Sequence, residues 1–192
     1  VAEHADPERH PLTTRFDEVD AALIFDDVVV PWERVFGYKN PQLLAGIMYI
    51  HTWAQYSTML RLITKLEGFL GIAQLLTQYG GRNKSAAAQI QLSSLMQDIE
   101  ILRSCIQVAE AKGYLSPAGT WAPLLSAAYR VHSIEASDRA ERTMEGLLTS
   151  TLMLSAGASD LTDDQIGPLV ERYFRGGAPS TKEHLRLMAI AA

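Results

Sequence analysis

The sequence predicts a mainly α-helical protein, an antiparallel helical bundle with a short N-terminal strand segment. From Gln42 onward, apolar residues recur with the period of a buried helix face. Before that point, the run from Ala21 to Val30 is rich in β-branched and aromatic residues, which favour strands. We therefore expect residues 1–41 to form an extended segment that completes a β-domain of a longer chain, and residues 42–192 to form a C-terminal helical bundle domain.

The N-terminal segment predicts two short strand pieces. Ala21–Phe25 and Val28–Val30 flank the polar pair Asp26-Asp27, and Pro31 ends any ladder because proline has no N–H to donate. Two strands are too few for an independent sheet, so we expect them to pair with a part of the protein outside this chain. The polar opening residues and the apolar last residues also favour a chain cut from a longer one.

Two long helices are expected first. One starts near Gln42 and ends at Gly80-Gly81, since glycine accepts the left-handed conformation that closes a helix. The next covers about Ser85 to Lys112 and is terminated by Gly113. Their predicted core faces are Leu43, Leu44, Ile47, Met48, Tyr49, Met59, Leu62, Ile63, Leu66, Phe69, Leu70, Ala73 and Leu76 in the first, and Leu92, Leu95, Met96, Ile99, Leu102 and Ile106 in the second.

A third long helix and two short ones should follow. Thr120 is a suitable N-cap for a helix that runs to about Leu148. Further on, Thr162-x-x-Gln165 and Ser180-x-x-Glu183 have the pattern of capping boxes. The first should open a short helix ended by Gly176-Gly177, and the second should open the last helix.

Composition excludes several classes of function. Over 192 residues, 47% are hydrophobic and 20% charged, which is enough apolar material for one core. The net charge of -5, without any basic block, argues against nucleic acid. A single cysteine, Cys105, cannot form an internal disulfide, and no long apolar span or secretory signal is present. We therefore expect a cytoplasmic protein with no membrane partner.

The residues from His10 to Phe36 carry a resemblance to a known family. The matching positions are His10-Pro11-Leu12, Arg15-Phe16-Asp17-Glu18, Asp20-Ala21, Phe25-Asp26-Asp27-Val28 and Val30-Pro31-Trp32-Glu33-Arg34-Val35-Phe36. This run resembles the 4-hydroxyphenylacetate 3-hydroxylase family, the oxygenase components of two-component, reduced-flavin-dependent aromatic monooxygenases. The wider pattern is similar to the acyl-CoA dehydrogenase superfamily, where it marks the passage from a β-barrel into a C-terminal helical bundle.

The resemblance implies an enzyme. Such oxygenases receive reduced FAD from a separate flavin reductase and use oxygen to place a hydroxyl ortho to the hydroxyl of a phenol, such as 4-hydroxyphenylacetate. Family residues that grip the phenol lie mostly upstream of Val1, so we assign no catalytic residue here and expect this chain alone to be inactive. Related enzymes are dimers of dimers, and the wide apolar helix faces likewise predict a homodimer or homotetramer.

Two groups of residues are candidates for binding FAD. Gln89 and Gln91 lie near a helix N-terminus, soon after Arg82, and orphan N–H groups there favour anions such as a diphosphate. A solvated helix start fits the same residues. The resemblance adds weight to the glutamines, because acyl-CoA dehydrogenases use an arginine and a glutamine in a similar position. The resemblance also points to Thr149, Ser150 and Thr151, which match a flavin-contacting loop; a structural helix end is the alternative.

Other residues favour structural roles. His51 could face a flavin or a substrate, but a surface or hydrogen-bonded histidine is the simpler interpretation. In the related 4-hydroxybutyryl-CoA dehydratases, a histidine here and a cysteine seven residues on hold an iron–sulfur cluster, whereas this chain has Thr58, which supplies no thiolate. We therefore predict no metal site. A dehydratase, an acyl-CoA dehydrogenase-like enzyme and a non-catalytic helical interaction module remain the alternative functions.

Overall fold

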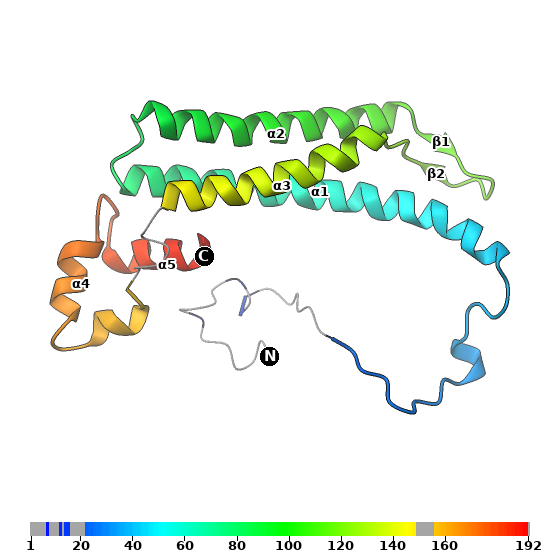
Figure 1. The fold of residues 1–192 in the computed structure, drawn as a ribbon, viewed down its shortest axis with the longest axis horizontal. Coiled ribbons are helices and arrows are strands. Elements are labelled where there is room, and N and C mark those ends of the chain that lie inside the picture. Colours follow the sequence, from blue (N-terminus) through cyan, green and yellow to red (C-terminus); the bar gives the residue numbers. More distant parts are fainter. Residues whose placement is uncertain (1–6, 8–11, 13, 16–21, 149–155, 192) are drawn as a thin grey trace.

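The computed structural model describes residues 7, 12, 14–15, 22–148 and 156–191. Within them the chain is mainly α-helical, which confirms the predicted fold class. Three long helices lie side by side, and successive ones run antiparallel (Figure 1). They are α1 (Gln42–Tyr79), α2 (Ala86–Ala111) and α3 (Ala127–Leu148).

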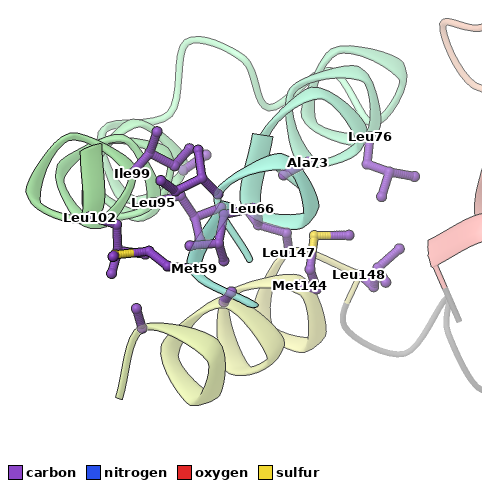
Figure 2. Close-up of a cluster of buried hydrophobic side chains, with 14 of the residues drawn as sticks. Met59, Leu66, Ala73, Leu76, Leu95, Ile99, Leu102, Met144, Leu147 and Leu148 are labelled. Atoms are coloured by element: carbon purple, nitrogen blue, oxygen red, sulfur yellow. The ribbon is translucent and has the colours of Figure 1, made fainter. Parts of the chain in front are cut away.

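One hydrophobic core fills the space between the three long helices. Figure 2 shows its side chains converging from all three helices. Each fully buried leucine or methionine contributes about 1.5–3 kcal/mol relative to exposure. The buried core residues are Met59, Ile63, Leu66, Ala73 and Leu76 of α1, Ala88, Leu95, Ile99, Leu102 and Ile106 of α2, and Tyr129, Ala136, Ala140, Met144, Leu147 and Leu148 of α3, joined by Met188 near the C-terminus. The predicted faces of α1 and α2 are therefore confirmed in the main, except that Leu43 is 48% and Met96 55% exposed.

The end of α1 is closed as its glycines predict. Gly81 has φ +68°, its N–H donates to the carbonyl of Gln78, and the N–H of Arg82 donates to the carbonyl of Thr77. These two bonds make a Schellman motif, which satisfies carbonyls that a helix end leaves without partners. Ser85 then precedes α2, so only a short turn separates α1 from α2 and the two helices must run antiparallel.

The predicted start of α3 at Thr120 is wrong. Strands β1 (Tyr114–Leu115) and β2 (Trp121–Ala122) instead form an antiparallel hairpin between α2 and α3. The turn needs Gly119, which has φ +76°. Gly113 permits the close approach of Trp121, because a Cβ there would lie 2.3 Å from the indole nitrogen. The hairpin uses the residues before Pro123, and α3 begins only afterwards.

The N-terminal strand pieces are not found as strands. Residues 22–30 form no ladder, and the chain turns at Asp27, where φ is 51°. A strand is defined by its hydrogen-bonded neighbour, and none of the described residues provides one. After Pro31 the chain enters the 3₁₀ turn η2 (Trp32–Arg34) that leads towards α1. Many apolar side chains of this segment are exposed, namely Leu23, Ile24, Phe25, Val28, Val29, Val30, Trp32 and Phe36.

Short helices pack where α1 finishes (Figure 1). They are η4 (Ala158–Thr162), α4 (Gly167–Phe174) and α5 (Thr181–Ala191). The capping box at Thr162 is wrong. Asp163 instead caps the turn before α4, because its Oδ1 accepts from the N–H groups of Gln165 (2.8 Å) and Ile166 (3.0 Å).

The second predicted capping box is half confirmed. Ser180 Oγ accepts from the N–H of Glu183 at 3.1 Å, so Ser180 does cap the start of α5. The Glu183 carboxylate does not return to Ser180. It accepts instead from the hydroxyl of Tyr79 at 2.9 Å, which joins α5 to the end of α1.

Candidate functional site

Three helix ends meet at one end of the bundle. The C-terminus of α1, the N-terminus of α2 and the C-terminus of α3 lie together there (Figure 1). The short turn after Gly81 places α2 beside α1, and the hairpin returns α3 alongside both. This end carries Gln89 and Gln91, two of the residues that the sequence identifies as candidates for binding FAD.

The N-terminus of α2 suits an anion. Ser85 makes no side-chain capping hydrogen bond, and no acidic residue lies in the first turn. Ala86 and Ala87 are exposed and have small side chains, and the N–H of Gln89 donates to the carbonyl of Ser85. Unsatisfied N–H groups and the positive end of the helix dipole attract phosphate. The donor set therefore fits a diphosphate.

The two glutamines occupy different surroundings. Gln89 is exposed, and its Nε2 donates weakly, at 3.4 Å, to the carbonyl of Asn83 in the turn before α2. Gln91 is half-buried and faces α3: a Cβ on Gly146 would lie 3.0 Å from Gln91 Nε2. Both amides thus stay near the start of α2, one towards its leading turn and one towards the end of α3.

The Arg82 side chain is hydrogen-bonded to the end of α3. Its guanidinium Nη2 donates a hydrogen bond to the main-chain carbonyl of Leu147, and Arg82 is half-buried. The carbonyl it meets is one of the last in α3, which a helix end leaves without an internal donor. Thr149, Ser150 and Thr151 follow α3 directly in sequence, but they lie outside the described residues.

The residues of α1 considered for a cluster or a flavin contact form local bonds. The His51 Nε2 lies 2.7 Å from the side-chain nitrogen of Gln55, one turn on. The Thr58 hydroxyl donates to the carbonyl of Ala54 at 2.8 Å. In α2, Cys105 is half-buried and packs against the core. Among the described residues, no group of three or more His, Cys, Asp or Glu side chains is arranged to hold a metal ion.

A buried polar cluster joins α2 to α3, and sequence analysis missed it. The Asp98 side chain is 5% exposed and accepts two bonds from Arg139, at 3.0 Å from Nε and 2.7 Å from Nη2. This pairing raises the pKa of Arg139 above its ordinary value. His132 Nε2 lies 3.3 Å from Asp98 Oδ1 without an aligned hydrogen bond. The sequence did contain a signal for this cluster, because Asp98 lies between Leu95 and Ile99 in the apolar stripe of α2.

The described part of the chain contains no helix that is both long enough and apolar enough to span a membrane.

The bundle with short helices at one end is a fold that solved proteins share. One solved structure that shows this fold is an oxygen-tolerant archaeal 4-hydroxybutyryl-CoA dehydratase from N. maritimus, with a TM-score of 0.70 over 88% of this chain and 34% of that one. Its sequence is 14% identical, so the similarity concerns the fold alone.

Two family models identify the family of this chain more narrowly than the shared fold does. The model for the 4-hydroxyphenylacetate 3-hydroxylase C terminal matches residues 43–192, and the model for the N terminal of the same hydroxylase matches residues 2–37. The chain therefore belongs to the 4-hydroxyphenylacetate 3-hydroxylase family, which confirms the resemblance seen in the sequence.

Two relatives illustrate the match. The 4-nitrophenol 4-monooxygenase/4-nitrocatechol 2-monooxygenase oxygenase component of Rhodococcus opacus is 28% identical over 95% of this chain and 35% of its own length. The crystal structure of the HpaB oxygenase component of 4-hydroxyphenylacetate 3-monooxygenase, complexed with FAD and 4-hydroxyphenylacetate, is 26% identical. It has a TM-score of 0.80 and covers 97% of this chain and 40% of that one. The chain thus spans well under half the length of these relatives.

Proposed function

We propose that this chain is the C-terminal part of the oxygenase component of a reduced-FAD-dependent aromatic monooxygenase, which hydroxylates a phenol ortho to its hydroxyl group. One observation of the structure supports this function most. The N-terminus of α2 is uncapped and free of acidic residues in its first turn, and it stands beside Gln89 and Gln91. It does so in a chain whose family includes an oxygenase solved with FAD and 4-hydroxyphenylacetate.

In this proposal, the residues around the N-terminus of α2 have separate roles in binding FAD. The first N–H groups of α2 and the Gln89 amide bind the diphosphate, and Gln91 donates from the side nearest α3. Thr149, Ser150 and Thr151 add hydroxyl contacts where the chain leaves α3. Bound reduced FAD would supply the oxygen chemistry, while the protein holds it in place and limits the access of water.

The substrate, oxygen and a reductase complete the proposal. The relatives are named for 4-nitrophenol and 4-hydroxyphenylacetate, so the shared substrate class is a phenol. Because both names describe an oxygenase component, we propose a separate flavin reductase as the source of reduced FAD. The lone Cys105 is consistent with a reducing cytoplasm.

We also propose that residues 1–41 complete a β-domain of a longer protein. The exposed apolar side chains between Leu23 and Phe36 support this, because an apolar segment of this size is normally covered. The division of the two family models between residues 37 and 43 gives further support.

The long helices also present apolar side chains outward, which supports a homodimer or homotetramer. Ile90 and Val108 of α2 are 70% and 50% exposed, and Ile134 of α3 is 71% exposed. Light scattering of the full-length protein should give at least twice the protomer mass. A clean monomer at micromolar concentration would refute the assembly.

The flavin site is tested by removing its two amides. Replacing Gln89 and Gln91 together by alanine in the full-length protein should weaken reduced-FAD binding by about 1–3 kcal/mol, roughly 5–150-fold, if both donate to charged phosphates. The matched control replaces Gln97 and Gln107, exposed glutamines of the same helix, and should leave affinity unchanged. Equal affinities for the two double variants, measured by anaerobic titration, would remove the glutamines from the site.

A further inference from the structure

Arg82 stands where two helix ends of opposite polarity adjoin. The positive N-terminus of α2 lies next to the negative C-terminus of α3, since Gln91 of α2 borders Gly146 of α3. An anion at the start of α2 would therefore have the negative end of α3 as its neighbour. The last turn of α3 contains no basic residue of its own, so any neutralising cation must come from elsewhere in the fold.

The turn after α1 supplies that cation. The Schellman motif fixes the backbone of Arg82, whose N–H bonds to the carbonyl of Thr77. The side chain then folds over Gly80, where an added Cβ would come within 3.4 Å of the Arg82 Nε. From there Nη2 donates to the carbonyl of Leu147. The turn formed by Gly80-Gly81-Arg82 thus places one guanidinium group at the C-terminus of α3.

The bond to Leu147 also bears on Gln91. The Leu147 side chain is 2% exposed and anchored in the core, so its carbonyl has little freedom once Arg82 holds it (Figure 2). Gly146 precedes Leu147 and lies against the Gln91 amide. Fixing the end of α3 therefore fixes the surface against which that amide rests.

We propose that Arg82 is a positioning residue for the diphosphate end of the flavin site. By binding the carbonyl of Leu147, it neutralises the negative end of α3 and holds Gly146 in place beside Gln91. Arg82 acts through α3 and Gln91 rather than by contact with the cofactor. This inference rests on the proposed function, in which Gln91 donates to bound FAD.

The first test needs no flavin. In the full-length protein, Arg82→Met should speed hydrogen exchange of the backbone amides from Met144 to Leu148, because the end of α3 loses its external donor. Arg82→Lys should restore much of the protection, since an ammonium group can also bind a helix-end carbonyl. Arg142→Met is the matched control: Arg142 also lies near the end of α3, but its side chain is 75% exposed and pairs only with Asp138 in the described structure. Unchanged exchange in Arg82→Met would overturn the proposal.

The second test is a double-mutant cycle on reduced-FAD affinity. Arg82→Met should weaken binding about tenfold, and the loss should be clearly smaller when Gln91 is already alanine, because the part of the loss that acts through Gln91 is then already gone. With Gln89 replaced instead, the two losses should add. Fully additive losses with Gln91 would overturn the positioning role, because Arg82 would then act independently of that amide.

The two tests separate the inference from the function on which it rests. Faster exchange at the end of α3 together with coupled losses of affinity supports both. Faster exchange with FAD affinity unchanged in every variant would overturn the proposed flavin site, while leaving the link between Arg82 and α3 intact.

Discussion

Gly146 of α3 lies directly against the side-chain amide of Gln91 on α2, so closely that a Cβ at Gly146 would be 3.0 Å from Nε2. A side chain at this position would have to displace the amide by a few tenths of an ångström. Glycine at position 146 therefore leaves room for the amide, although α3 itself would be more stable with alanine.

Replacing Gly146 by alanine should separate stability from binding. Removing a helical glycine should stabilise the chain by up to about 1 kcal/mol, while displacement of the Gln91 amide should weaken reduced-FAD binding about threefold, part of one hydrogen bond. Gly71→Ala is the control, because Gly71 is an exposed residue of α1 with no atom within 4 Å of an added Cβ. If both variants bind FAD equally well, the Gln91 amide has no part in the site.

The ion pair between Asp98 and Arg139 should be costly to break from one side. Arg139→Met leaves the Asp98 carboxylate buried without its main partner, and it should reduce the free energy of unfolding by about 3 kcal/mol. This value is at the low end for buried pairs because the Arg139 side chain is 40% exposed. Urea denaturation followed by circular dichroism measures the change.

A second substitution supplies the control for this prediction. Adding Asp98→Leu to Arg139→Met should recover most of the lost stability, since an apolar pair of similar size requires no buried charge. A double variant as unstable as Arg139→Met alone would show that packing, rather than the unpaired carboxylate, causes the loss.

The lowered pKa of Asp163 should make the stability of the region around α4 depend on pH. Hydrogen bonds from the N–H groups of Ile166 and Gln165 lower the pKa of Asp163 below its ordinary value of 3.8. A carboxylate with a lowered pKa stabilises the folded state fully above the ordinary value, and this contribution is lost as the pH falls through the lowered pKa. Asp163→Asn should remove that part of the acid sensitivity.

Thermal melts of this chain from pH 6 down to pH 3 measure the effect. The gap in melting temperature between the wild type and Asp163→Asn should be largest at pH 6 and shrink towards pH 3. Asp164→Asn, which changes the exposed neighbouring carboxylate, is the control. A gap that stays constant with pH would mean that the carboxylate charge does not hold the turn before α4.

Local signals in the sequence predicted the ends of α1 and α2 well. Gly80-Gly81 closes α1 because only a left-handed residue completes the Schellman motif, and Ser85 and Gly113 flank α2 as expected. The predicted start of α3 was wrong because a threonine such as Thr120 can either cap a helix or end a hairpin turn. Trp121 decided between them, since its ring packs against Gly113 and, at 5.4 Å between ring centroids, against Trp53 of α1.

The candidate site was predictable only in part. The position of Gln89 and Gln91 at a helix start follows from local sequence, and the structure places both there. The contact of Gln91 with Gly146 and the bond from Arg82 to Leu147 depend on how α3 packs against α2, which no local pattern specifies. Asp98 was missed for the same reason, because its partner Arg139 lies on another helix.

This chain by itself should produce no catechol. Oxygen chemistry on a flavin is productive only where water is excluded, and the described bundle leaves its N-terminal segment, including Phe36 at 94% exposure, uncovered. Supplied with reduced FAD, oxygen and 4-hydroxyphenylacetate, the chain should yield peroxide alone. Stoichiometric catechol would place the catalytic groups inside this chain and make His51, Tyr49 or His132 candidates for them.

The most direct measurement is catechol formation by the full-length protein. A flavin reductase with NADH would supply reduced FAD, a set of para-substituted phenols would be offered under ¹⁸O₂, and chromatography with mass detection would identify the products. We predict an ortho-hydroxylated product that carries ¹⁸O, and less of it at limiting flavin when Gln89 and Gln91 are both alanine. The absence of ¹⁸O-labelled catechol with every phenol, while the protein still binds reduced FAD, would contradict the proposed hydroxylase function.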